Sequence, residues 1–152
     1  MAANEIEILL IEDNPSDVEL TLHALRHHKL VNQIQVARDG EEALDFIFCR
    51  GKFSKHRFNR PPKLILLDLQ LPKVDGLEVL RAIKSDRRTK HIPVVILTSS
   101  REDQHRIDSY NVGVNSYIQK PVDFDQFRAT IEQLSLYWVV VNQPPAAQAH
   151  RT

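Results

Sequence analysis

The chain has 152 residues, with 20 basic and 20 acidic side chains and a formal net charge of zero. That length suits one domain with its own core, and 42% hydrophobic and 26% charged residues are typical of a soluble globular protein. A single cysteine, Cys49, excludes an intramolecular disulfide and a metal site built from cysteines. The neutral charge argues against a nucleic-acid binder that depends on phosphate contacts. Without a signal peptide pattern or an apolar run of about 18 residues, we expect a cytoplasmic protein with no membrane span.

Short apolar runs recur along the chain and predict the strands of a sheet. Residues 64–67 and 93–97 are continuously apolar, as expected for central strands that are covered on both faces. Residues 34–36 alternate between apolar and polar, which predicts a strand nearer an edge. The predicted strands are 6–11, 34–36, 64–67, 93–97 and 116–118.

Helical patterns alternate with these runs. Asn14 before Pro15 predicts an N-cap followed by proline at the first helical position, and Asp39 with Glu42 predicts a capping box. Asp123 opens the last helix. The predicted helices cover 15–25, 39–48, 76–84, 102–110 and 123–141. Strands that alternate with helices indicate an α/β fold with a doubly wound, five-stranded parallel sheet.

Five polar residues stand directly after predicted strands, and they form the candidate site. Glu12 and Asp13 follow the first strand, Asp68 the third, Thr98 the fourth and Lys120 the fifth. Each alone has an ordinary explanation as a cap, a turn residue or a solvated side chain. Because ligands of open α/β sheets bind beyond the carboxyl ends of the strands, we expect the five to converge at one edge.

The residue types at this edge restrict the chemistry. Three clustered carboxylates repel one another unless a cation neutralises them. A few oxygen ligands without histidine or cysteine suit Mg²⁺, which keeps water and substrate oxygens in its coordination sphere. A carboxylate beside Mg²⁺ and a lysine is a candidate nucleophile toward phosphorus. The sequence therefore predicts an aspartyl phosphate.

At these positions the sequence resembles the receiver domains of two-component response regulators. The matching motifs lie within about residues 5 to 135 and are Glu12-Asp13, the stretch 66–76, Leu97-Thr98 and the stretch 117–121. The resemblance implies a flavodoxin/CheY-like (βα)5 receiver fold. We expect this domain, with an extended C-terminal helix, to cover residues 1–142, and residues 143–152 to form a disordered tail.

The resemblance also implies a role for each site residue. Asp68 is the expected phosphoacceptor, and Thr98 and Lys120 are expected to hold the phosphoryl group. The Lys120-Pro121 peptide bond is expected to be cis. The implied Mg²⁺ ligands are Glu12 through water, Asp13, Asp68 and the backbone carbonyl of Gln70.

A switch is implied by the pair Thr98 and Tyr117. Movement of Thr98 toward the phosphoryl oxygens would leave space for the Tyr117 ring to turn. We expect this pair to couple the site to the face of the sheet that carries the last helix. A half-buried strand residue is the alternative interpretation of Tyr117.

Two features resemble the single-domain, phytochrome-associated (Rcp-type) response regulators: the long segment before Leu64 and the extended last helix. This resemblance implies a sensor histidine kinase of the phytochrome type as partner. Without a DNA-binding domain or an enzymatic module, we expect output by changed protein contacts or by transfer to a downstream phosphotransfer or effector protein. Catalysis should be limited to the chain's own phosphorylation and dephosphorylation.

The last predicted helix is apolar on several sides, which favours burial or pairing with another helix. We predict a homodimer through this helix, and the alternative is that its end folds back onto its own domain. The expected interface residues are Phe127, Leu134, Tyr137 and Trp138.

The segment 50–63 contains six basic residues and no acid. A solvated loop is the simpler interpretation, and a docking surface for an acidic partner or for nucleic acid is the alternative.

Two other functions compete with a receiver. A haloacid-dehalogenase-type phosphatase also uses an aspartate nucleophile, but it needs a second acid two residues later, where this chain has Gln70. An interaction module that works without phosphorylation would not need the intact group of five site residues.

Overall fold

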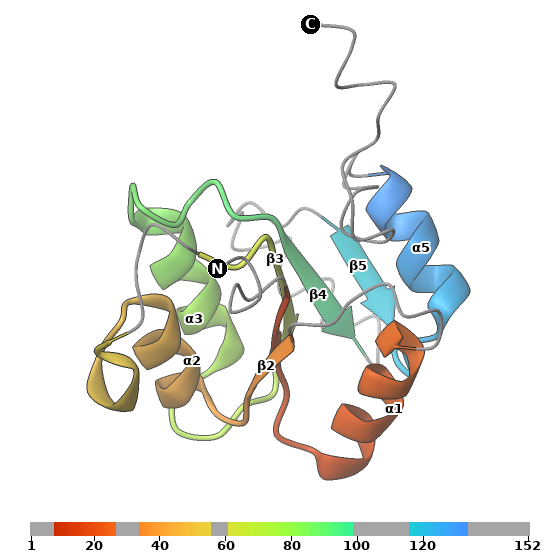
Figure 1. Cartoon of the computed structure of the whole chain (residues 1–152), viewed down its shortest axis with the longest axis horizontal. Helices are drawn as coiled ribbons and strands as arrows, with labels where there is room; N and C mark the ends of the chain where they lie inside the picture. Colours follow the sequence, from red (N-terminus) through yellow and green to blue (C-terminus); the bar gives the residue numbers. More distant parts are fainter. Residues whose placement is uncertain (1–7, 27–33, 56–60, 99–115, 134–152) are drawn as a thin grey trace, which may run out of the picture.

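Residues 8–26, 34–55, 61–98 and 116–133 are described by the computed structural model of this protein. Its five strands form one parallel sheet in the order β2-β1-β3-β4-β5, which confirms the predicted doubly wound fold (Figure 1). The strands are β1 (Ile8–Ile11), β2 (Ile34–Ala37), β3 (Leu64–Asp68), β4 (Val94–Thr98) and β5 (Ser116–Gln119). The helices within the described residues are α1 (Pro15–Arg26), α2 (Gly40–Ile47), α3 (Gly76–Ser85) and α5 (Phe124–Gln133), with a short 3-10 turn, η2 (Gly51–Phe53).

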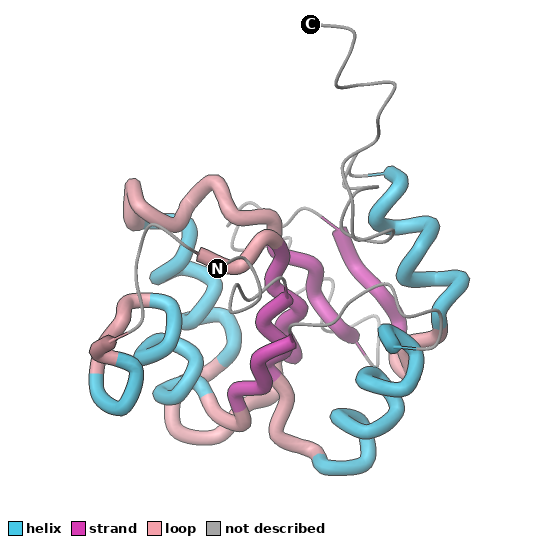
Figure 2. The backbone as a smooth tube through the Cα atoms, viewed as in Figure 1, coloured by secondary structure: helices cyan, strands magenta, loops and turns pink. Residues whose placement is uncertain are grey.

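Helices cover the sheet on both faces, so the core has two halves. Figure 2 shows the strands between the two helical layers, with α2 and α3 on one side and α1 and α5 on the other. Side chains alternate along each strand: Ile65 and Leu67 pack toward α2 and α3, whereas Leu66 packs toward α1 and α5. All residues of β1, β3 and β4 are buried, which explains their continuous apolar sequences.

Side-chain caps fix where the helices begin. The Asn14 side-chain oxygen accepts the N–H of Ser16 at 2.9 Å, and Asp123 accepts the N–H of Gln126 at 2.8 Å. Asp39 accepts the N–H of Glu42 at 2.7 Å, as its position predicts. The Glu42 carboxylate bonds the N–H of Arg38 at 2.8 Å, one residue before the cap, so the reciprocal half of a capping box is displaced.

The first part of the basic segment packs on its own domain. Lys52 pairs with Glu42 of α2 at 2.7 Å, and the Phe53 ring meets Phe46 edge-on with centroids 5.1 Å apart. These contacts favour a structural role for this part, and residues 56–60 lie outside the described residues.

Three further predictions also lie outside the described residues: the helix 102–110, the apolar stretch 134–141 and the tail 143–152. Among the described helices, none is long and apolar enough to cross a membrane.

Gly76 allows α3 to begin directly against the chain that follows β3. Its N–H donates to the Leu69 carbonyl oxygen at 3.0 Å, and a Cβ at this position would lie 2.6 Å from the same oxygen. The crowded atom belongs to the backbone, so it cannot turn away as a side chain would. The loop that carries Gln70 therefore depends on a glycine here.

We predict that Gly76→Ala lowers the free energy of unfolding by about 1–3 kcal/mol, because the added methyl forces a backbone shift. Urea unfolding of the two proteins measures the difference. Glu78→Ala, at an exposed position of the same helix, is the matched control and should change stability by less than about 0.5 kcal/mol. Equal unfolding midpoints for the two variants would contradict the prediction.

Candidate functional site

The parallel sheet brings the predicted site residues to one edge. Glu12 and Asp13 follow β1 directly, and Asp68 is the last residue of its neighbour β3. Thr98 ends β4, and the N–H of Lys120, just after β5, donates to the Thr98 carbonyl oxygen at 2.7 Å. Residues far apart in the sequence thus meet because each follows the same end of a parallel strand.

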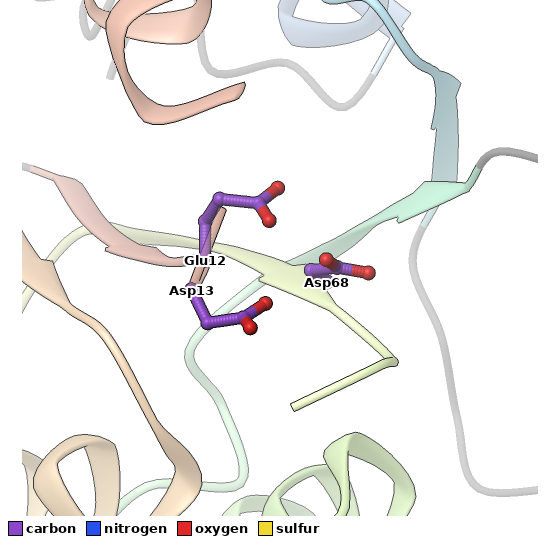
Figure 3. Close-up of side chains that lie close together, drawn as sticks. All are labelled: Glu12, Asp13 and Asp68. Carbon is purple, nitrogen blue, oxygen red and sulfur yellow. The ribbon is translucent and has the colours of Figure 1, made fainter. Parts of the chain in front are cut away.

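Three carboxylates form an acidic group at this edge. Oxygen atoms of Glu12, Asp13 and Asp68 all lie within 4.8 Å of one another (Figure 3). Glu12 and Asp68 are buried, whereas Asp13 is exposed. Carboxylates this close repel one another, and oxygen donors with one side open to solvent suit a hard divalent cation. The donor set therefore fits a divalent metal ion.

The Lys120 ammonium lies among carboxylates from three different elements. Its Nζ donates to Asp17 at 2.9 Å, to Glu12 at 3.1 Å and to Asp68 at 3.1 Å. An ammonium has three N–H donors, so every donor has an acceptor. Only 14% of the Lys120 side chain is exposed, which strengthens these charge-assisted bonds.

Asp17 belongs to this arrangement, although it is not among the site residues predicted from the sequence. It lies in the first turn of α1, and its N–H donates to the Asn14 side-chain oxygen at 3.1 Å. An acidic residue in a first helical turn is usually explained by the helix dipole. The available signal was position: α1 begins at the same edge of the sheet where the strands end, so its first turn lies beside the site.

The Asp68 carboxylate is held on both oxygens. Oδ2 accepts from Lys120 at 3.1 Å, and Oδ1 accepts the N–H of Gln70 at 3.2 Å. The loop after β3 thus supplies a backbone donor directly to Asp68. The role of the Gln70 carbonyl as a metal ligand stays a prediction.

Electrostatics at the site favour a charged lysine and a partly protonated acid. Burial raises the pKa of Glu12 to about 7, and the hydrogen bond and negative charge of Asp68 add to this rise, against the opposing effect of Lys120. Burial alone would lower the pKa of Lys120, but the bond to Asp17 and the charges of Asp68 and Glu12 raise it above its usual value. Lys120 is therefore an ammonium at neutral pH, while the Glu12 carboxyl group is about half protonated near pH 7.

The structure shows the side of the sheet on which Tyr117 rests, and the direction in which its ring would turn stays a prediction. Tyr117 is half-buried and packs on the α2 and α3 side of the sheet. Its neighbour Ile118 faces α1 and α5 instead, because side chains alternate along a strand. Tyr117 therefore does not face the last helix. Thr98 is buried at the end of β4, and the switching role of the pair stays a prediction.

One expected interface residue is corrected. The Phe127 side chain is 1% exposed and packs in the core beneath α5, so it is not available to a second chain. Leu134, Tyr137 and Trp138 lie outside the described residues. The Lys120-Pro121 peptide bond is cis, as the resemblance implies.

The fold and the acidic edge of the sheet define a receiver. The family described as the response regulator receiver domain matches residues 8–132. The chain therefore belongs to the receiver domains of response regulators, which bind a divalent metal ion at an acidic pocket and are phosphorylated on aspartate by a sensor histidine kinase.

Within this family the chain is similar to regulators linked to phytochromes. The response regulator Rcp1 of Synechocystis is 37% identical, over 92% of this chain and 93% of Rcp1. The Mn²⁺-bound structure of Rcp1 has a TM-score of 0.71 at 34% identity, and the match covers 93% of this chain and 99% of that one. The bacteriophytochrome response regulator RtBRR is 49% identical with a TM-score of 0.83, covering 93% of this chain and 84% of RtBRR. The phosphorylated cyanobacterial phytochrome response regulator RcpA is 37% identical with a TM-score of 0.71, covering 89% of this chain and 94% of RcpA.

We predict that binding of a divalent cation strengthens as the pH rises through about 7. Protonated Glu12 competes with the cation, and its raised pKa of about 7 places the loss of that proton in this range. Titration calorimetry with Mn²⁺ between pH 6 and 8 should show affinity that falls by up to about tenfold per unit below pH 7. Glu12→Gln should bind more weakly and with a flatter pH profile. An affinity of the unaltered chain that does not change with pH would contradict the prediction.

Proposed function

We propose that Asp68 is the phosphoacceptor of this receiver and that Mg²⁺ is held by Glu12 through water, by Asp13 and Asp68, and by the Gln70 carbonyl. The observation that carries this proposal is the position of the Asp68 carboxylate. It lies in the acidic group, and it also accepts a hydrogen bond from Lys120 at 3.1 Å. Asp68 therefore combines a place for a cation with an ammonium beside its reacting oxygens.

In the proposed reaction an Asp68 oxygen forms a bond to phosphorus. The bond from phosphorus to the histidine nitrogen of the kinase breaks, and its electron pair stays on that nitrogen. Lys120 offsets the charge of the phosphoryl oxygens, and the Thr98 hydroxyl donates a hydrogen bond to one of them. When bound, Mg²⁺ supplies further positive charge to these oxygens.

The similarity to phytochrome-linked regulators supports a sensor histidine kinase of the phytochrome type as the donor. The expected output is a changed protein contact, or passage of the phosphoryl group to a downstream phosphotransfer or effector protein. We expect this exchange in the cytoplasm, with no substrate turnover besides the chain's own phosphorylation and dephosphorylation. The phosphatase alternative lacks support, since Gln70 stands where a second acid would be needed.

We predict that incubation with Mg²⁺ and acetyl phosphate adds one phosphoryl group to the full chain, measured by intact mass. Asp68→Asn should gain none, because an amide is a poor nucleophile. Asp125→Asn, an exposed aspartate in the first turn of α5, is the matched control and should be phosphorylated like the unaltered chain.

Two results would contradict the assignment. One is phosphorylation of Asp68→Asn by a sensor histidine kinase. The other is an unaltered chain that gains no phosphoryl group from acetyl phosphate or from a kinase. Phosphorylation of Asp68→Asn would place the acceptor elsewhere. Failure with both donors would favour the module that works without phosphorylation.

We also propose a homodimer through the apolar stretch after α5, with Leu134, Tyr137 and Trp138 at the interface. The support is the sequence, which is apolar on several sides of the predicted helix. Sedimentation of the full chain should show a dimer, and Trp138→Glu should shift the population toward monomer because it would bury a charge in the contact. Two monomeric proteins would contradict the proposal.

A further inference from the structure

We propose that Asp17 is the positioning residue for Lys120, holding its ammonium so that one N–H points at the reacting carboxylate of Asp68. This inference rests on the proposed function, in which Asp68 accepts the phosphoryl group. It adds a residue of α1 to a site whose other members follow the strands of the sheet.

The geometry around the ammonium singles out Asp17. Among the three bonds of Lys120, the one to Asp17, 2.9 Å, is the shortest. Lysine has a long, flexible side chain, and fixing one direction for its ammonium needs acceptors on other sides. Glu12 and Asp17 occupy two of the three donors, which leaves the third for Asp68.

The backbone that carries Asp17 is held in place by the cap of α1. The Asp17 backbone N–H is bonded to the N-cap Asn14 at 3.1 Å, in a first turn that follows β1 closely. Asn14 in turn donates its own N–H to the Glu12 carboxylate at 3.3 Å. Asn14 thus bonds the carboxylate of Glu12 and the backbone of Asp17, two of the three residues that accept from Lys120.

The three acceptors of Lys120 differ in their roles. Asp68 is the group that reacts, and Glu12 belongs to the acidic group proposed to serve the metal. Asp17 is not a member of that group, and its side chain lies toward Lys120 instead. Asp17 can therefore keep its bond to Lys120 when the charge on Asp68 changes during transfer.

A purely structural role makes a different prediction. The Asp17–Lys120 pair also joins α1 to the segment that leads into α5, and these two helices contact each other. If the pair only fastened the helices together, its loss would lower stability and leave the phosphorylation rate of the folded protein unchanged. The two roles are separated by measuring rate and stability on the same variants.

The experiment uses the full chain with acetyl phosphate and saturating Mg²⁺, and follows the initial phosphorylation rate by intact mass at a temperature where all variants are folded. Asp17→Asn keeps the shape but loses the charge. We expect its maximal rate to fall at least about tenfold, since a misplacement of about 1 Å at a reacting centre can cost about a hundredfold in rate. The Mg²⁺ concentration for half-maximal rate should change much less. Asp17→Glu restores the carboxylate and should recover part of the rate.

Asp125→Asn is the control, because it removes the same charge from the first turn of another helix. It should match the unaltered chain in rate. Urea unfolding of each variant reports the stability separately.

Three results would overturn the inference. The first is a rate for Asp17→Asn within twofold of the unaltered chain. The second is a rate for Asp17→Glu no higher than that of Asp17→Asn. The third is an unaltered chain that gains no phosphoryl group from acetyl phosphate or a kinase, and only this result also overturns the proposed function.

Discussion

The site depends on one ammonium that stands among more negative charges than it can neutralise. Lys120 bonds Glu12, Asp17 and Asp68, and Asp13 adds a fourth carboxylate at the same edge. Burying Glu12 without this partner would be costly, and even with it the pKa of Glu12 rises to about 7. The remaining negative charge is what makes the site receptive to a divalent cation. The affinity of the site for a divalent cation thus follows from the excess of carboxylates over the single ammonium.

The sheet and its loops hold this charge distribution in place. The loop after β3 is fixed from two sides: Gly76 donates to the Leu69 carbonyl at 3.0 Å, and the N–H of Gly40 at the start of α2 donates to the Pro72 carbonyl at 3.3 Å. Lys73 of the same loop pairs with Asp39, the N-cap of α2, at 3.6 Å. The loop that presents a backbone N–H to Asp68 is therefore packed against α2 as well as α3.

Patterns that depend on one element could be predicted from the sequence, and contacts between elements could not. The order of strands and helices and the convergence of Asp68 with Lys120 follow from apolar periodicity and from the position of polar residues after strands. The role of Asp17 depends on where a lysine far along the chain directs its ammonium, which no local pattern records. The burial of Phe127 does follow from helical spacing, since Phe127 stands four residues before Ile131 on the face of α5 that packs on the sheet. The side of the sheet on which Tyr117 lies depends on where the alternation of side chains begins in a four-residue strand, and the sequence of so short a strand does not fix this starting point.

Because of that alternation, β5 connects the site to both faces of the sheet. Tyr117 packs toward α2 and α3, and Ile118 packs toward α1 and α5. At the end of the strand the N–H of Gln119 donates to the Gln126 side chain of α5 at 3.1 Å, directly before Lys120. A movement of Lys120 at the site would therefore act on the residue beside this bond to α5, whereas a movement of Tyr117 would act on the opposite face. β5 therefore joins the site to α5 through Gln119 and to the α2 and α3 side of the sheet through Tyr117.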